Sequence, residues 1–443
     1  MRLPDSRLAV MDHPRDGGRV VRSLVADPLR RLRRPLGRIA AFSVLPAVSL
    51  VSSLLVLPIL SARFGQDGWS SVLLGQSIGA AASVVCALAW PMEGPDLASR
   101  AGAADRVQMY ATSLRERTVA VAAAVPVLVV MCLFAGPTMP LVCILSALAF
   151  ALNALAPTWY FIGVSRPSRS LVAEGVPRLV VNLVAIGLVA LLPLWTYPVA
   201  LIVGMLCTLL IASTFVRRDA RNSAGAVDLA GSPRGPAGGR RRLLTVTARG
   251  ADAGYSYLSG PLIALLVPAA YPLYAAVDRL GQSMVNLMGT ITQGLMAWIG
   301  EGGVVKRGRL VGAVVLASAF AFGALLVLSL ATPFLLGYLF AGTVEVNALI
   351  AVLAGVIVGG AFLSRCLSVV LLIPQGLAVV TYRLLLVASC IGLPSVAVAA
   401  VVGGSVGALA VAAAVPWAVV AAQLVMGLHR RPQGRVNDTA LQV

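Results

Sequence analysis

The chain has 443 residues, of which 59% are hydrophobic and only 12% are charged, and its formal net charge is +18. A soluble protein of this length cannot bury that much apolar surface, so lipid must solvate much of the chain. The positive charge does not indicate nucleic-acid binding, because it is divided among short loops and two tails rather than gathered on one basic face.

A basic segment precedes the first apolar run. Residues 1–37 include an arginine cluster between Arg30 and Arg34. We expect this tail to lie in the cytoplasm, where anionic headgroups attract arginine side chains. The apolar run that follows is longer than the roughly 7–15 residues of a signal-peptide core, so we interpret it as a retained helix.

Twelve long apolar segments follow, each close to the roughly 20 residues that a helix needs to cross a bilayer. A segment rich in Gly, Ser, Pro and Arg divides them six and six, and its composition predicts a flexible cytoplasmic linker. The predicted domains are a tail at 1–37, a six-helix lobe at 38–216, the linker at 217–250, a second six-helix lobe at 251–428 and a tail at 429–443. The predicted spans are Ile39–Ala62, Ser70–Pro91, Thr118–Ala135, Thr138–Gly163, Leu171–Leu192, Trp195–Val216, Tyr255–Ala270, Pro272–Ile299, Leu310–Pro333, Val346–Ile373, Leu377–Val402 and Ser405–Leu428.

The basic residues fix the orientation of these spans. Thirty of the 35 lie in the two tails and in alternate loops, four lie within spans, and Arg63 alone lies in the opposite set of loops. Basic residues accumulate on the cytoplasmic side of a membrane, so both termini are predicted to be cytoplasmic. The sequence therefore predicts an all-α, multi-pass protein of the inner (plasma) membrane.

The two sets of six spans show signs of an internal repeat. Arg178-Leu179 is followed after six residues by Ile-Gly-Leu, and Arg383-Leu384 is followed in the same way, 205 positions later. Chance matches are frequent in so aliphatic a chain, but the paired Arg and Gly favour duplication. Six is an even number, so both halves enter the membrane in the same direction, and substrate sites in such parallel repeats lie between the halves.

Cysteine and histidine usage narrows the possible chemistry. The six cysteines are single residues within apolar spans, without the CxxC spacing of a metal or redox site. The only histidines, His13 and His429, lie in the tails. We therefore expect no metal, no cofactor and no histidine base within the membrane body.

Charged residues inside predicted spans are the candidate functional groups, because each is costly to insert into a bilayer. Glu174 lies four residues before Arg178, a spacing that favours an ion pair on one helix face. This pair either tunes a cavity or is purely structural, and snorkelling to the membrane surface is an alternative for Arg279 and Arg383. A cavity lined by these groups is cationic and suits phosphate oxygens. The predicted substrate-binding residues are Arg178, Arg279, Arg365 and Arg383, and the candidates for binding a coupling ion are Asp278 and Glu174.

Three classes of membrane function compete. A membrane enzyme of glycan assembly is disfavoured by short outer loops, and a channel by the number of helices. The major facilitator architecture also has six plus six spans, but the loop from Glu93 to Arg100 lacks its signature, and Asp278–Gln282 matches part of it at the wrong end of a span. A transporter built of two six-helix halves fits best.

Several short motifs resemble those of polysaccharide biosynthesis proteins, the Wzx-type lipid-linked oligosaccharide flippases of the multidrug/oligosaccharidyl-lipid/polysaccharide (MOP) exporter superfamily. The motifs are degenerate, and the resemblance covers about residues 38–428. The almost complete use of Arg over Lys, with Lys306 as the single lysine, is atypical of many members of this family. The segments are Arg63-Phe64-Gly65, Trp90–Gly94, Trp159–Gly163, Glu174–Arg178 and Tyr271–Gln282.

The resemblance implies two pseudo-symmetric lobes around a cationic cavity that moves a polyprenyl-pyrophosphate-linked oligosaccharide from the inner to the outer leaflet. It also implies a proton or sodium ion for coupling, contact with membrane lipids, and glycan polymerase or assembly proteins as partners. The alternative within the superfamily is an ion-coupled multidrug exporter, for which the excess of four arginines over two acids within spans is unfavourable.

Overall fold

The computed structural model describes residues 54–223, 239–300 and 307–429. Within these ranges the chain is helical and contains no strand. The predicted tails and the first half of the first predicted span, residues 39–53, lie outside the described residues.

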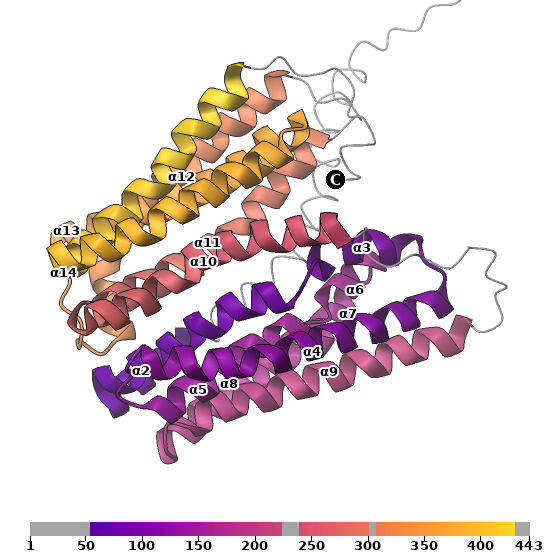
Figure 1. Ribbon diagram of the computed structural model, residues 1–443, viewed down its shortest axis with the longest axis horizontal. Helices are drawn as coiled ribbons and strands as arrows, with labels where there is room; N and C mark the ends of the chain where they lie inside the picture. The colour runs from indigo at the N-terminus through magenta and orange to yellow at the C-terminus, as the bar shows by residue number, and fades with distance from the viewer. Residues whose placement is uncertain (1–53, 224–238, 301–306, 430–443) are drawn as a thin grey trace, which may run out of the picture.

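Two bundles approach each other at one end and diverge toward the other (Figure 1). The first bundle consists of α2 (Leu57–Cys86), α3 (Trp90–Arg100), α4 (Ala103–Phe134), α5 (Pro140–Ala151), η1 (Leu152–Leu155), α6 (Thr158–Gly163), α7 (Pro167–Ser170), η2 (Leu171–Gly175), α8 (Val176–Leu191) and α9 (Thr196–Ser223).

The second bundle follows the same plan of long helices joined by short turns. It consists of α10 (Gly239–Leu266), η3 (Pro268–Ala270), α11 (Tyr271–Gly300), α12 (Arg307–Leu339), α13 (Ala348–Leu367), η4 (Ser368–Leu372), η5 (Ile373–Gln375) and α14 (Ala378–His429).

Helix α14 contains two spans, and α2 contains the second predicted span preceded by the last residues of the first. The chain changes direction inside α2 at Gly65 and inside α14 at Gly404, with φ of 62° and 59°. This left-handed conformation is one that glycine adopts without steric cost. Among the described residues, eight helical segments are long and apolar enough to cross a membrane, and α2 and α14 are among them. With the two spans of α14 counted separately and the more polar α10 and α11 added, the described helices match eleven of the twelve predicted spans; only the end of the first lies within the described residues. The all-α fold class is confirmed.

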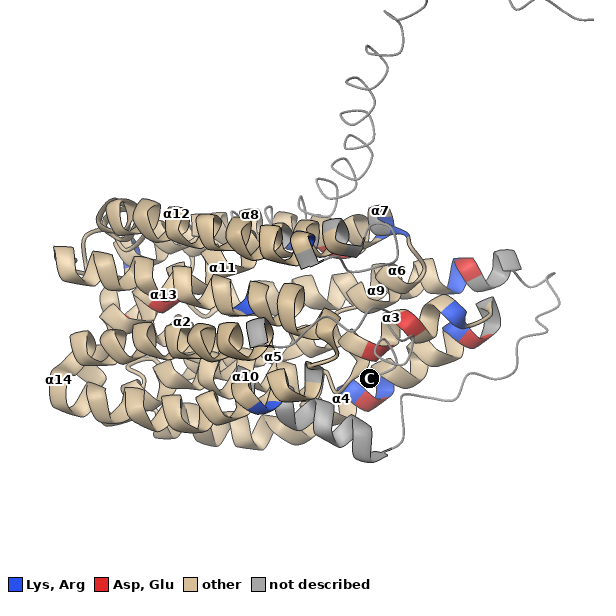
Figure 2. Ribbon diagram, turned by 90° about the horizontal axis from the view of Figure 1, so that it is seen from above, with Lys and Arg blue, Asp and Glu red and all other residues tan. Residues whose placement is uncertain are grey.

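Apolar side chains cover the outside of both bundles. Large exposed residues such as Val127, Phe134, Leu330 and Phe334 lie along α4 and α12. An exposed apolar surface of this extent is expected where lipid is the solvent. Charged side chains instead gather toward one end of the molecule (Figure 2). The orientation predicted from the loops makes this the cytoplasmic end, and the protein is a multi-pass membrane protein.

Close helix packing in the first bundle depends on two small residues of α2. Gly75 and Gly79 form a GxxxG spacing, and a Cβ at either position would overlap the backbone oxygen of Cys143 or Ala147 in α5. Small residues at this spacing let helix backbones approach within a membrane. The segment of α2 that carries Gly75 and Gly79 is therefore fixed against α5, and its opposite face is free to meet the other bundle.

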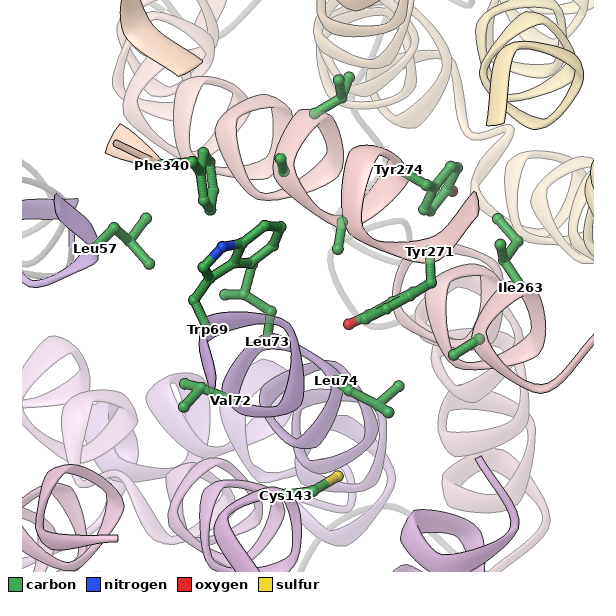
Figure 3. Packing of buried hydrophobic residues seen from close by; sticks show 14 of the residues in the cluster. Leu57, Trp69, Val72, Leu73, Leu74, Cys143, Ile263, Tyr271, Tyr274 and Phe340 are labelled. Carbon is green, nitrogen blue, oxygen red and sulfur yellow. The ribbon is translucent and has the colours of Figure 1, made fainter. Parts of the chain in front are cut away.

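The two bundles share one core only at the end opposite the charged side chains. There Trp69, Leu73 and Leu74 of α2 pack with Tyr271 and Phe340 of the second bundle (Figure 3). Toward the cytoplasmic end each bundle has its own core, around Phe362 and Leu367 in the second bundle and around Trp90 and Trp159 in the first. The lobes are thus joined at the outer end and separately packed at the cytoplasmic end.

Two predicted boundaries differ from the structure. Helix α4 begins at Ala103, so residues assigned to the loop before Thr118 are helical. Helix α9 continues to Ser223 and α10 starts at Gly239, so the predicted linker at 217–250 is helical at both ends, and 224–238 lies outside the described residues. Helices α4, α9 and α10 continue beyond the hydrocarbon region, where water can solvate their polar side chains. A fall in hydropathy along the sequence therefore does not mark the end of these helices.

Candidate functional site

A cavity of about 450 Å³ lies between the two lobes. The first lobe contributes α2, α5, η1, α8 and α9, and the second contributes α10 and α11. The shared outer core closes one end, since Leu73 belongs both to that core and to the cavity wall. The polar lining residues are Gln76, Ser77, Ser83, Asn153, Arg178, Asn182, Tyr197, Thr208, Tyr257, Asp278, Arg279, Gln282, Ser283 and Asn286.

Arg178 faces this cavity from α8. Its Nη2 lies 2.8 Å from Oε1 of Glu174, so the ion pair predicted from the sequence spacing is present. The same nitrogen donates to Oδ1 of Asn153 at 3.0 Å. The Arg178 side chain is 32% exposed and that of Glu174 is 8% exposed. The carboxylate is therefore buried behind a guanidinium that a ligand can reach.

Local breaks in two neighbouring spans place this pair. Residues Leu171–Gly175 form a π-helical turn, and Pro177 follows at the start of α8. The preceding span changes from α5 to the 3₁₀ turn Leu152–Leu155, and Thr158 after this break donates its hydroxyl hydrogen to Oε2 of Glu174. Irregular backbone within a membrane is tolerated where it is buried in protein or lines a cavity, and π-turns are frequent at functional sites.

Arg279 is the cationic group that the second lobe contributes. It lines the cavity from α11, and its buried Nε has no hydrogen-bond partner within the part of the chain that the structure describes. No salt bridge to it is present among the described residues. A buried guanidinium donor without an acceptor is costly, so this position favours an acceptor supplied by a ligand.

Asp278 also lines the cavity and is half-buried. Its Oδ2 accepts from Nε2 of Gln282 at 2.7 Å, and that nitrogen also donates to the Ser256 oxygen at 3.0 Å. The carboxylate thus lies at the edge of the cavity within a polar group of α10 and α11.

The other two predicted arginines lie outside the cavity lining. Arg365 is exposed on α13, and its Nη1 is 3.4 Å from Oδ1 of Asn286, which does line the cavity. Arg383 is exposed on α14 and makes no salt bridge among the described residues. The sequence repeat that pairs Arg383 with Arg178 is therefore not matched by equivalent positions at the site.

The charge balance of the cavity follows from these positions. Arg178, Arg279 and Asp278 line it, and Glu174 is buried behind Arg178. These two arginines and two carboxylates balance, so the four groups have no net charge, whereas the sequence count gave an excess of two arginines. Arg178 is paired with Glu174, whereas Arg279 makes no salt bridge among the described residues.

Sequence reasoning missed a fully buried arginine near the site. Arg117 was assigned to a cytoplasmic loop, but its side chain is 0% exposed within the first lobe. Its Nη1 donates to the oxygens of Ala154 and Ala156 at 2.8 and 3.0 Å, and its guanidinium lies over the Trp159 ring. Arg117 therefore holds the break in the α5–α6 span from the side opposite the cavity. This role was not predicted because Arg117 lies in the polar part of α4, just before the apolar stretch that identifies the span.

Comparison with known proteins gives a likeness of fold. No family profile and no curated protein sequence matches this chain. Among solved structures, it resembles an inward-facing multidrug resistance MATE family transporter of the MOP superfamily, with 13% identity, a TM-score of 0.55, and coverage of 91% of this chain and 99% of that one. It also resembles the eukaryotic MATE transporter AtDTX14, with 13% identity, a TM-score of 0.52, and coverage of 92% and 98%. The Vibrio cholerae MATE transporter VcmN is 16% identical, with a TM-score of 0.50 and coverage of 90% and 98%.

These likenesses agree with the predicted two-lobed architecture of twelve spans, which is that of the MOP exporters. At this level of identity they concern the fold and not the substrate.

Proposed function

We propose that this protein is a transporter that moves a polyprenyl-pyrophosphate-linked oligosaccharide from the inner to the outer leaflet by alternating access. The observation that carries the proposal is Arg279, which lines the interlobe cavity and whose buried Nε has no acceptor among the described residues. Guanidinium groups bind phosphate oxygens through parallel hydrogen bonds. A pyrophosphate bound at Arg279 would supply an acceptor there, and Arg178 offers a second guanidinium in the wall of the same cavity.

The arrangement of the lobes supports alternating access. The shared core and the contact of Trp69 with Phe340 close the outer end, while the cytoplasmic ends of the lobes pack separately. This is the arrangement expected of a transporter that accepts its substrate from the cytoplasmic side. Export then requires the outer contacts to open as the cytoplasmic ends close.

The size of the cavity limits which part of the substrate it holds. A volume of about 450 Å³ is at the lower end of the usual range for ligand sites. It suits a pyrophosphate with its first sugar, not a whole oligosaccharide. The remaining sugars would extend toward the cytoplasm, where the lobes diverge (Figure 1).

We propose that Asp278 binds the coupling proton or sodium ion. Its carboxylate is adjacent in sequence to Arg279, so a change in its charge alters the field at the anion site. Glu174 is the second candidate, since its ion pair with Arg178 would respond to the same ligand.

Ion-coupled multidrug export is the alternative function. It is favoured by the solved structures of similar fold, one of which is described as a multidrug resistance transporter. Aromatic and thioether side chains in the cavity wall, such as Phe150, Tyr257 and Met205, are also compatible with an apolar cation.

Deletion of the gene distinguishes the two functions. We expect lipid-linked oligosaccharide to accumulate in the cytoplasmic leaflet, with loss of surface glycan and unchanged sensitivity to cationic drugs. Complementation by the intact gene, but not by Arg279→Gln at equal protein level, is the matched control. Drug hypersensitivity with a normal lipid-linked pool would overturn the flippase proposal in favour of the alternative.

A further inference from the structure

A lipid-linked substrate poses a geometric problem that a soluble one does not. Its headgroup crosses the membrane through a polar cavity while its hydrocarbon chain stays in lipid, so the cavity wall must part along its length. In the outer half of this protein the seam between the lobes is packed by the shared core around Trp69 and Tyr271. A hydrocarbon chain that accompanies the headgroup outward therefore needs another opening in that half.

An apolar groove lies on the outside of the first lobe, between α8 and α9. It has a volume of about 300 Å³, and its lining residues are aliphatic apart from Trp195 and Thr196. Its residues include Val184 and Leu188 on α8 and Val199 and Val203 on α9, and it reaches Trp195 at the outer end. Val184 and Val203 are exposed on the membrane-facing surface. The groove thus runs through the outer half of the lobe in contact with lipid.

The groove and the cavity meet at a single side chain. Val181 lines both of them, with Asn182 on the cavity side and Val184 on the groove side. Val181 is one helical turn beyond Arg178, which brings the proposed headgroup site and the groove onto the same helix.

The wall at this point is thin because α9 has a glycine there. Gly204 lines the cavity opposite Val181, and a Cβ at Gly204 would lie 2.8 Å from Cγ2 and 3.1 Å from Cβ of Val181. Val181 is the residue that the linings of the polar cavity and the apolar groove share, and a small separation of α8 from α9 at this contact would connect the two.

We infer that the α8–α9 seam at Val181 and Gly204 is a lateral passage for the prenyl chain of the substrate, and that the groove holds that chain while the pyrophosphate lies in the cavity. This inference rests on the proposed function. It assigns a long, uncharged polyisoprenyl chain to the groove, because the groove is lined almost entirely by apolar side chains and shares Val181 with the wall of the proposed anion site.

The first test locates the chain by photolabelling in nanodiscs. The probe is a polyprenyl pyrophosphate with a diazirine in its tail. We expect labelled peptides from α8 and α9, with labelling reduced by excess inorganic pyrophosphate. The control probe is the prenol with the same diazirine but no pyrophosphate. If both probes label the groove equally and pyrophosphate does not compete, the groove holds only surrounding lipid and the inference is wrong.

The second test closes the seam. A Cβ at position 204 would lie 3.1 Å from the Cβ of Val181, which is near the range that a disulfide spans, so Val181→Cys with Gly204→Cys should cross-link after a small adjustment. The exposed Cys207 and Cys390 are replaced by Ala in every variant. Oxidation should lower tail labelling by roughly tenfold or more. Loss of even a few contacts between the groove and methylene groups of the prenyl tail weakens tail binding by that factor. Reduction should restore it, which also shows that the double variant is folded.

A matched clamp provides the control. Gly392→Cys with Val415→Cys joins the corresponding pair of spans in the second lobe, where a Cβ at Gly392 would lie 3.2 Å from Cγ1 of Val415 and 2.8 Å from Cε2 of Tyr255, so the Tyr255 ring must shift to admit it. This clamp should leave tail labelling of α8 and α9 unchanged. Equal inhibition by both clamps, or no inhibition by the first, would overturn the passage.

Binding of inorganic pyrophosphate to the intact protein separates the two proposals. If pyrophosphate binds but the tail labels other helices, only the passage is wrong. If pyrophosphate does not bind, the proposed function fails and the passage fails with it.

Discussion

Trp69 of α2 packs against Phe340, which directly follows α12, with ring centroids 4.4 Å apart. The Trp69 Nε1 also donates to Oγ1 of Thr343 at 3.2 Å, and Ser61 donates to the Leu339 oxygen at 3.4 Å. These contacts join the two lobes across the outer end of the cavity (Figure 3). They must break for the cavity to open outward, so their strength sets the balance between the two conformations.

Trp69→Ala should shift this balance toward the outward-open state. The aromatic contact and the hydrogen bond each contribute about 1 kcal/mol, so the open fraction should rise by roughly 5- to 50-fold. Distances between spin labels on the outer turns of the two lobes measure the shift. Trp195→Ala, at an exposed tryptophan of the same end, is the control. An unchanged distance distribution would show that Trp69 does not hold the outer end closed.

Glu174→Gln should strengthen anion binding. The carboxylate competes with a ligand for Arg178, and loss of about 1 kcal/mol of that competition tightens pyrophosphate binding by roughly three- to tenfold. Calorimetry on the purified protein measures the affinity. Thr158→Val removes the other partner of Glu174 without a change of charge, and should not tighten binding. Weaker binding in Glu174→Gln would mean that the pair positions the site instead of competing with the ligand.

Arg117→Ala should destabilise the first lobe. The substitution leaves the oxygens of Ala154 and Ala156 unpaired inside the protein, which lowers the free energy of unfolding by roughly 2–5 kcal/mol. Thermal unfolding in detergent measures this effect. Arg115, two residues earlier on the same helix, is exposed, and Arg115→Ala should change stability by about 0.5 kcal/mol or less. Equal stability of the two variants would contradict the structural role of Arg117.

Asp278→Asn should uncouple transport from the ion gradient. The amide keeps the hydrogen-bonding capacity toward Gln282 but cannot change its charge. In proteoliposomes, we expect the variant to retain pyrophosphate binding and to lose the stimulation that a proton or sodium gradient gives the wild type. Asp96→Asn, at an exposed pair with Arg100, is the control. If the gradient still stimulates transport by Asp278→Asn, Asp278 does not bind the coupling ion, and Glu174 becomes the candidate.

The sequence predicts those features that depend on local pattern. Hydropathy and loop charge identify the spans and their orientation, and the four-residue spacing identifies the Glu174–Arg178 pair. Arg63, the single arginine in the outer loops, has a structural role that counting basic residues in loops does not predict. It donates to the oxygens of Leu191 and Leu192, and thereby caps the C-terminal end of α8.

Features that depend on tertiary packing were not predictable. Whether an intramembrane arginine faces the cavity is set by the rotation of its helix, which separates Arg279 from Arg365 and Arg383 although all three lie in apolar segments. The burial of Arg117 depends on a break in another span, more than 30 positions away. The passage at Val181 depends on a glycine in the next helix. None of these relationships leaves a periodic signal in the sequence.

Binding of inorganic pyrophosphate to the wild type and to Arg279→Gln tests the central claim most directly. We expect the wild type to bind, and the variant to bind roughly 10- to 150-fold more weakly, as loss of charged hydrogen bonds predicts. Arg218→Gln, an exposed arginine at the cytoplasmic end of α9, should bind like the wild type. Equal affinity in Arg279→Gln and the wild type would contradict the assignment of the cavity as the site for the anionic headgroup.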